Sequence, residues 1–114
     1  MKFMLLIHQG TTPIPGTDAW DALSDDEKNG VYAAYQAVNQ TPGFTPGQQL
    51  GGPDAATTVR AENGTPQVRE GAIEDPLAGY GFFEADDREA AIALAAKIPA
   101  ASMGGAVEVR PFVG

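Results

Sequence analysis

The pattern of hydrophobic and polar positions along the chain predicts short strands that alternate with two helices. Residues 3–7 form a short, continuous apolar run, which favours a central strand with both faces covered over a helix. Residues 80–85 predict another strand, and residues 106–112 alternate valine with charged residues, as in a strand with one buried face. Residues 48–53 predict a weaker strand at a sheet edge.

Two segments carry apolar residues at the three- and four-residue spacing of an amphipathic helix. In the first, residues 24–39, Ser24 and Glu27 match the capping box, in which each side chain bonds the backbone N–H of the other residue. In the second, residues 86–98, the same capping pattern recurs at the start, and Pro99 follows the last apolar position.

Residues 56–61 and 66–70 are two short β-prone runs that flank an Asn63-Gly64 pair. This pair is a strong hairpin signal because a type I′ turn requires positive φ at both central residues. The order of elements is therefore strand, helix, strand, hairpin, strand, helix, strand. It predicts an α+β domain of the ferredoxin-like, split βαβ plan, with an extra hairpin and two helices on one face of an antiparallel sheet.

The open face of such a sheet requires a partner, because two helices cover only the opposite face and an uncovered apolar face is unstable in water. A second copy of the chain is the simplest partner. We therefore expect a homodimer that is joined through the open sheet face.

Composition narrows the class of protein. A length of 114 residues fits a single domain over residues 1–114. A net charge of −8 without a basic cluster argues against nucleic acid or an anionic membrane as a partner. The absence of cysteine excludes disulfides and cysteine zinc sites, and the apolar runs are too short for a membrane span. The N-terminal run lacks a signal-peptide cleavage site, so we expect a cytoplasmic protein.

Five segments, taken in order along the chain, carry a resemblance to a known family. They are Met-Lys-Phe-Met-Leu-Leu-Ile at 1–7, Leu-Ser-Asp-Asp-Glu at 23–27, Ala-Ala-Thr-Thr-Val-Arg at 55–60, and the segments 89–101 and 104–112. In this order they resemble the YCII-related proteins, most closely the branch with an Asp-Gly-Pro-Phe signature. The resemblance implies a dimeric α/β barrel, in which two ferredoxin-like units pair sheet to sheet and enclose a cavity.

The chain departs from this family at the positions of its signature and of its proposed chemistry. The signature falls on Glu-Gly-Ala-Ile at 70–73, where only Gly71 is retained and Glu70 keeps a carboxylate. The acidic segment that follows is shortened to residues 74–79. Family members with proposed chemistry place a histidine on the first helix near an aspartate, and Val31 stands at that helix position here. The family's His–Asp pair therefore cannot be transferred to this chain.

His8 is the one histidine of the chain and ends the first predicted strand. On that strand it shares a face with Met4 and Leu6, the face expected to line the barrel cavity. A histidine there is suited to act as a general base or to bind a ligand. If the last strand lies beside the first, Glu108 would pair with His8 as a second catalytic residue. Arg110 would then be placed to bind an anionic substrate, whereas an ordinary charged pair is the alternative interpretation.

Three carboxylates form a local acidic group beside glycines: Glu70, Glu74 and Asp75. Carboxylates in such a group serve acid–base chemistry or bind a hard cation. Their spacing matches no metal loop, however, and one histidine without cysteine argues against zinc. We therefore favour a solvated acidic loop and expect no metal and no cofactor. Of these three carboxylates we assign only Glu70 to substrate binding, together with Met4, Leu6 and Arg110.

The aromatic residues are spread along the chain, too far apart in sequence to form the stacking platform of a nucleic-acid-binding protein. We interpret them as core residues or as the wall of a pocket. This interpretation applies to five of the nine aromatic residues, Trp20, Tyr32, Tyr35, Phe82 and Phe83.

Two functions fit these residues, and the sequence leaves both open. The first is a cofactor-free enzyme in which His8 assists proton transfer on a small hydrophobic or aromatic molecule in the barrel cavity. The second is a non-catalytic ligand-binding or accessory dimeric module that has lost the family's His–Asp pair. A carboxylate partner of His8 favours the enzyme, whereas a cavity filled by Met4 and Leu6 favours the second function.

Overall fold

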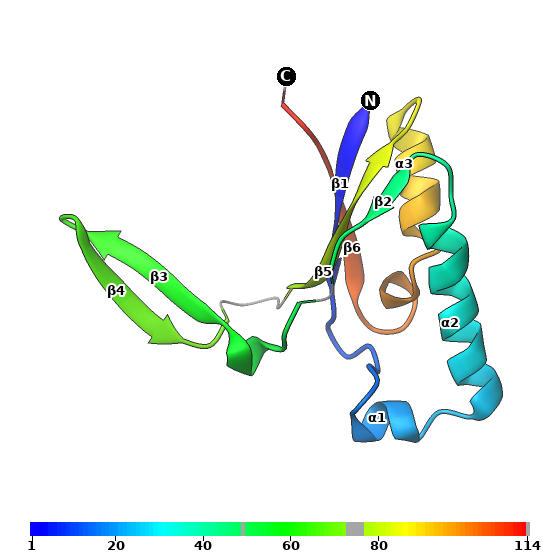
Figure 1. The fold of residues 1–114 in the computed structure, drawn as a ribbon, viewed down its shortest axis with the longest axis horizontal. Coiled ribbons are helices and arrows are strands. Elements are labelled where there is room, and N and C mark those ends of the chain that lie inside the picture. The colour runs from blue at the N-terminus through cyan, green and yellow to red at the C-terminus, as the bar shows by residue number, and fades with distance from the viewer. Residues whose placement is uncertain (49, 73–76, 114) are drawn as a thin grey trace.

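The computed structural model describes residues 1–48, 50–72 and 77–113. Figure 1 shows an α+β domain in which helices lie on one side of a sheet and a hairpin projects on the other. The elements are, in chain order, β1 (Lys2–His8), α1 (Asp18–Asp21), α2 (Asp25–Asn39), β2 (Phe44–Pro46), η1 (Pro53–Ala55), β3 (Thr57–Glu62), β4 (Thr65–Glu70), β5 (Leu77–Glu84), α3 (Arg88–Ala95), η2 (Pro99–Ala101) and β6 (Ala106–Pro111).

Strands β2, β5, β1 and β6 form a four-stranded sheet in that order, and every neighbouring pair is antiparallel. When the β3–β4 hairpin is set aside, this strand order is compatible with the ferredoxin-like class. Helices α2 and α3 both lie on one face of the sheet, and none of the described helices covers the other face (Figure 1). None of the helices in the described residues is long and apolar enough to cross a membrane.

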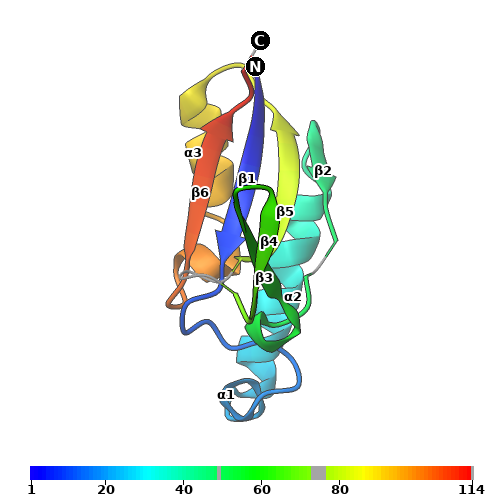
Figure 2. The ribbon, with the colours of Figure 1, turned by 90° about the vertical axis from the view of Figure 1, so that its left-hand side faces the viewer.

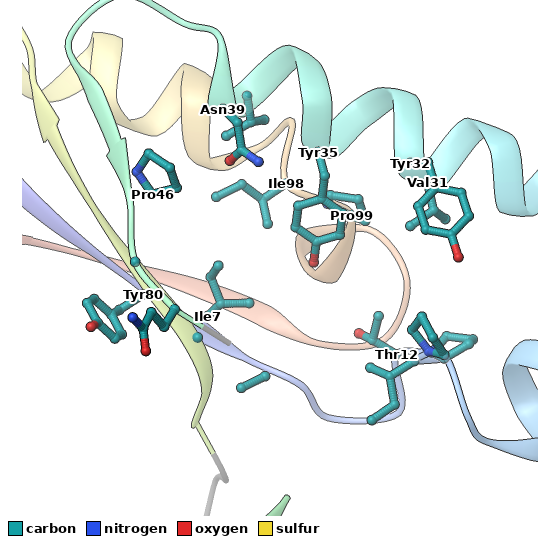
Figure 3. Close-up of a pocket in the computed structure, with 18 of the residues that line it drawn as sticks. Ile7, Thr12, Val31, Tyr32, Tyr35, Asn39, Pro46, Tyr80, Ile98 and Pro99 are labelled. Atoms are coloured by element: carbon teal, nitrogen blue, oxygen red, sulfur yellow. The ribbon is translucent and has the colours of Figure 1, made fainter. Parts of the chain in front are cut away.

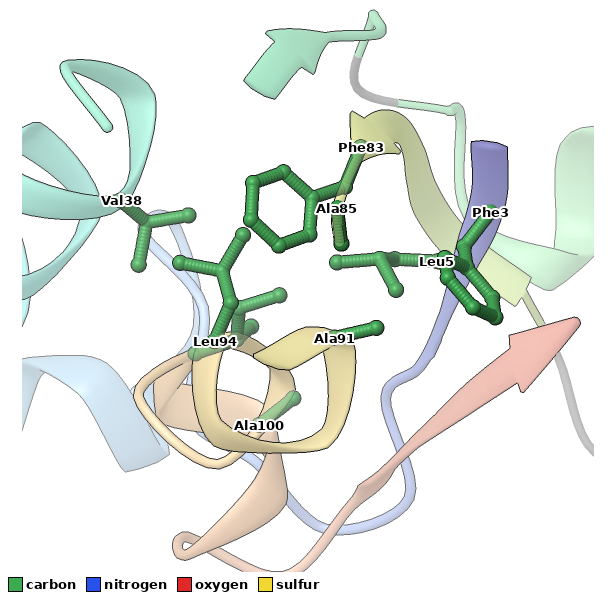
Figure 4. Close-up of a cluster of buried hydrophobic side chains, with 9 residues drawn as sticks. Phe3, Leu5, Val38, Phe83, Ala85, Ala91, Leu94 and Ala100 are labelled. Atoms are coloured by element: carbon green, nitrogen blue, oxygen red, sulfur yellow. The ribbon is translucent and has the colours of Figure 1, made fainter. Parts of the chain in front are cut away.

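The core lies between the sheet and these helices (Figure 4). Phe3 and Leu5 of β1 are almost completely buried, and Phe83 of β5 is paired with Phe3. Ala91 and Leu94 of α3 pack against them in the same cluster. Complete burial of one large apolar side chain contributes about 1.5–3 kcal/mol to the stability of the folded state. Alternate residues of β1 therefore fix which face of the sheet the helices cover.

Helix α2 begins where the sequence predicts, because Ser24 and Glu27 complete the capping box. The Ser24 hydroxyl accepts a hydrogen bond from the backbone N–H of Glu27 at 3.1 Å. The Glu27 carboxylate accepts one from the backbone N–H of Ser24 at 3.0 Å. The backbone and side-chain hydrogen bonds from Ser24 lower the pKa of Glu27, because they stabilise its charged form.

Helix α3 starts one residue later than the predicted capping pattern requires. Its N-cap is Asp87, whose carboxylate accepts a hydrogen bond from the backbone N–H of Ala90 at 2.9 Å. A box over 86–89 would have needed Asp86 as the N-cap. The side chain of Asp87 therefore caps this helix, one residue after the predicted N-cap and in place of the predicted reciprocal pair.

The expected edge strand over residues 48–53 is wrong. Among its described residues none belongs to a strand, and the edge strand β2 lies earlier in the chain. It follows directly after a turn in which Gly43 has a φ of 87°. Phe44 of β2 is paired with Phe83 and packs against the core. The packing of this phenylalanine against the core places the strand, whereas Leu50 in the segment after it is 39% exposed.

Strands β3 and β4 form a separate hairpin, and its turn confirms the predicted type I′ geometry. Asn63 and Gly64 have φ values of 52° and 80°. Figure 2 shows the hairpin in front of the sheet face that carries no helix. Val59 and Val68 are cross-strand partners and are 59% and 62% exposed. The projecting hairpin raises the radius of gyration to 16.0 Å, whereas a compact domain of this length has about 13 Å.

Replacing Ser24 with alanine should lower the free energy of unfolding by about 1 kcal/mol, because backbone N–H groups at the start of α2 lose their acceptor. Denaturant unfolding followed by circular dichroism measures the change. Ser102→Ala is the matched control, since the Ser102 hydroxyl makes only a 3.4 Å contact with a carbonyl. Equal stability of S24A and S102A would contradict a stabilising role of the capping box.

Candidate functional site

The open face of the sheet brings together the side chains that the sequence assigned to a site, with the exception of Glu70. Strand β6 lies beside β1, with Leu6 opposite Glu108 and Met4 opposite Arg110. Residues that face each other across antiparallel strands point to the same side of a sheet. His8 follows on that side by the alternation of β1. Met4 and Leu6 are half-buried there, and the helices cover the opposite face.

His8 and Glu108 are in direct contact. Nε2 of His8 lies 3.1 Å from Oε1 of Glu108. The second carboxylate oxygen, Oε2, accepts a hydrogen bond from Nε of Arg110. The exposed fractions of the side chains are 25% for His8, 39% for Glu108 and 67% for Arg110. The cluster therefore runs from a half-buried imidazole to a guanidinium in solvent.

The neighbours of Glu108 hold its pKa below the ordinary value. The hydrogen bond from Arg110 is the larger cause and the one to His8 is the second, while partial burial opposes both. A carboxylate that stays charged near neutral pH only accepts hydrogen bonds. Nε2 of His8 must then carry the proton in this contact. The proton-accepting nitrogen of the neutral ring is consequently Nδ1.

An aromatic group adjoins the charged cluster on the same face. Tyr80 and Phe82 of β5 are paired with Leu6 and Met4 of β1. Their ring centroids lie 5.9 Å apart in an edge-to-face arrangement. Phe82 also stacks on Phe112, with a centroid distance of 5.9 Å and an angle of 28° between the rings. An apolar surface thus borders the imidazole and its carboxylate.

The structure does not bring the predicted acidic group to this cluster. Glu70 ends β4 on the projecting hairpin, where it is exposed and paired with Thr57. Glu74 and Asp75 lie outside the described residues. Within the described ranges, no group of three or more His, Cys, Asp or Glu residues is placed to hold a metal ion.

Sequence reasoning missed a concave feature on the other side of the sheet. A cavity lies there beside α2, and Thr12, in the loop after β1, contributes to its wall. Trp20, Tyr32 and Tyr35, which we interpreted as core or pocket wall, line the same cavity. The sequence marks Thr12 only as part of a loop with prolines and glycines, and loops ordinarily lie on the surface. The signal that was available is the three aromatic residues themselves, which the sequence already allowed as the wall of a pocket.

Comparison with known proteins adds no relative: no protein-family model matches the chain, and a search of the curated proteins finds no match. The functional interpretation of the open face therefore rests on its geometry. Two observations matter most, namely the contact between His8 and Glu108 and the apolar surface beside it.

Replacing Arg110 with glutamine should raise the pKa of Glu108 towards its ordinary value, because it removes the larger of the two stabilising hydrogen bonds. A depressed carboxyl pKa stabilises the fold above the unfolded-state pKa, and this stabilisation is lost as the pH falls through the folded-state value. The stability of the R110Q variant should therefore depend less on pH in this acidic range than the stability of the wild type does. An NMR titration of the glutamate side-chain carboxyl carbons measures the shift.

Arg69→Gln is the matched control for this titration, because Arg69 lies on the hairpin and donates to the backbone carbonyl of Ala72. The pKa of Glu108 should be the same in R69Q and in the wild type. If the pKa of Glu108 stayed equally low in R110Q, the hydrogen bond from Arg110 would not be the main cause of the low value.

Proposed function

We propose that the chain is a cofactor-free enzyme in which His8 assists proton transfer on a small hydrophobic or aromatic molecule. The observation that supports this most is the contact between His8 and the carboxylate of Glu108. A carboxylate behind an imidazole orients the ring and stabilises its protonated form, as a general base requires. The half-buried side chains of Met4 and Leu6 offer an apolar surface for the substrate beside it.

The proposed chemistry needs no redox partner. His8 takes a proton from an acidic C–H or O–H group of the substrate and returns it at another position or to solvent. Glu108 keeps its charge and stabilises the imidazolium during this step. Arg110 holds Glu108 in place and, at the exposed end of the cluster, is available to an anionic group of the substrate.

A homodimer joined through the open sheet face is the second part of the proposal. The chain exposes 7569 Å² of surface, about 1,600 Å² more than expected for a compact monomer of its mass. Two copies that covered this excess would bury an area within the roughly 2,000–5,000 Å² of obligate homodimers. The paired aromatic and apolar side chains of the open face are the natural part to be covered.

The β3–β4 hairpin supports the same pairing. An isolated two-stranded hairpin is at best marginally stable in water. Val59 and Val68 are nevertheless exposed on it, and it projects from the side of the sheet where a second copy would lie (Figures 1 and 2). Contact with the partner would cover these valines and close the His8 site between two sheets. The result would be the dimeric α/β barrel implied by the resemblance to the YCII-related proteins.

A non-catalytic ligand-binding module is the second candidate function. It is favoured by the cavity on the helix-covered side of the sheet, whose lining in the described residues includes no charged side chain. Such a cavity is able to hold a ligand but offers no group for acid–base chemistry. Under this function the His8–Glu108 contact would serve to hold the edge strand β6 against β1.

Sedimentation velocity at low micromolar concentration should give a species of about twice the 11.9 kDa chain mass. Leu6→Glu should shift this species to the monomer, because it places a charge in the proposed interface. Ile92→Glu is the matched control, since Ile92 is 42% exposed on α3, away from the open face. A monomeric wild type would contradict the barrel.

Nitrobenzisoxazole tests the proposed base without knowledge of the substrate. A base removes the C–H proton of its ring as the N–O bond breaks, and a coloured cyanophenolate forms. General-base catalysis should make the wild type faster than His8→Gln by on the order of a hundredfold. Absorbance measures the rate, and sedimentation checks that both variants keep the same oligomeric state.

Glu108→Gln should give an intermediate rate, because the imidazolium loses its charged partner but the base remains. Glu62→Gln, an exposed change on the hairpin, is the control and should match the wild type. Equal rates for the wild type and H8Q would contradict the enzyme and leave the ligand-binding module.

A further inference from the structure

A cavity of about 370 Å³ lies on the side of the sheet opposite to His8, between α2 and the helix-facing surface of the sheet (Figure 3). This volume falls within the usual range of small-molecule sites. Val31 and Tyr35 of α2 form one wall, and Ile7 of β1 forms the wall across from them. Gly79 of β5 also lines the cavity, and its lack of a side chain keeps this part of the space open.

The lining determines the charge of any ligand. In the part of the chain that the structure describes, the cavity is lined by apolar, aromatic, amide and hydroxyl side chains, without Asp, Glu, Lys, Arg or His. A charged molecule would lose its hydration there without gaining an ion pair. A ligand of this cavity is therefore neutral and mostly apolar.

The hydroxyl of Tyr35 is the polar group that a ligand in this cavity would meet. Figure 3 shows it directed from α2 into the space between the helix and the sheet. The side chain is half-buried and packs against the core, which holds the ring in place. Within the described residues the hydroxyl has no hydrogen-bond partner, and protein atoms do not enclose it completely. It is therefore open to a ligand in the cavity.

The environment of Tyr35 makes its hydroxyl a hydrogen-bond donor. Burial raises the pKa of the phenol, so the hydroxyl keeps its proton at physiological pH. Thr12 also lines the cavity, but its own hydroxyl is completely enclosed and no ligand reaches it. A carbonyl oxygen of the ligand is the matching acceptor. A ligand hydroxyl would instead bring a further donor beside the apolar wall at Ile7.

Two aromatic rings lie at the end of the cavity nearest to α1. Trp20 and Tyr32 both line it and contact each other edge to face, with ring centroids 5.4 Å apart. Aromatic rings pack favourably against one another in offset or edge-to-face arrangements. The lining therefore favours an aromatic ligand over an aliphatic one.

We propose that this cavity binds a small, neutral aromatic molecule with a carbonyl group that accepts a hydrogen bond from Oη of Tyr35. The inference rests on the second candidate function, the ligand-binding module, and names its class of ligand. It does not depend on the proposed enzyme, because His8 lies on the opposite face of the sheet.

Acetophenone and α-methylstyrene are the probes, because they have nearly the same planar shape and differ in a carbonyl oxygen in place of a methylene group. An NMR titration follows the indole N–H signal of Trp20, the one tryptophan of the chain. Both probes should shift this signal in the wild type. Tyr35→Phe should weaken the binding of acetophenone about fivefold, because it removes one hydrogen bond and keeps the ring. The affinity for α-methylstyrene should stay unchanged.

Tyr32→Phe is the matched control, since it makes the same change one helical turn away, at a residue that is 56% exposed. It should leave the affinity for acetophenone unchanged, and an equal loss in Y32F would overturn the assignment to Tyr35. Y35F should unfold at the wild-type temperature, because the lost hydroxyl makes no hydrogen bond within the described structure.

Gly79→Leu tests the location of the site independently of the hydroxyl. A Cβ atom at Gly79 would lie 3.8 Å from Cδ1 of Ile7, an ordinary contact, so the strand accommodates the side chain. The leucine should fill part of the cavity and weaken both probes. Gly30→Leu is its control, because an added Cβ at this exposed position of α2 meets nothing within 4 Å. G30L should bind both probes as the wild type does.

The proposal would be overturned if neither probe bound the wild type, if Y35F bound acetophenone as tightly as the wild type, or if the anion p-toluate bound more tightly than acetophenone. Loss of binding in His8→Gln would also overturn it, because the ligand would then lie on the open face. Equal nitrobenzisoxazole rates for the wild type and H8Q would contradict the enzyme alone and leave the cavity proposal intact.

Discussion

The central strand β1 carries apolar side chains on both of its faces, and the rest of the structure is arranged around this constraint. Phe3 and Leu5 are covered by the helices within the chain. Met4 and Leu6 point to the other face, where they are only half-buried. One chain with two sheet-covering helices thus satisfies one face of its own central strand, and the proposed pairing of two copies satisfies the other.

Over residues 79–82, the neighbouring strand β5 divides large and small side chains between the same two faces. Tyr80 and Phe82 lie on the open face opposite residues of β1, whereas the next ring, Phe83, belongs to the core on the helix side. On the helix side it has Gly79 and Gly81, which leave space. A Cβ atom at Gly81 would lie 2.5 Å from the ring of Phe44, so this glycine admits the phenylalanine that anchors β2. Gly79 lines the cavity instead, and a side chain there would fill part of it. The pattern of β5 therefore produces an aromatic open face and a cavity behind it.

Two local signals predict local structure correctly in this chain, whereas the capping pattern at 86–89 is one residue out and contacts between distant residues depend on packing. The capping box at Ser24 and the turn at Asn63-Gly64 are each complete within a few residues, and both form as predicted. The contact between His8 and Glu108 joins residues 100 positions apart, so the sequence supports it only on the condition that β6 lies beside β1. Thr12 gave no signal at all, because the burial of a loop residue is decided by the elements that close over it.

Solvent exposure sets how strongly the charged cluster acts on His8. Glu108 and Arg110 are 39% and 67% exposed in the single chain, and water screens an ion pair at such a surface. A second copy laid on the open face would remove much of this water and strengthen the same hydrogen bonds, because the local dielectric falls. The carboxylate would then hold the imidazole more firmly. Under the proposed function, dimerisation therefore does more than cover apolar surface, since it completes the electrostatic environment that a general base at His8 needs.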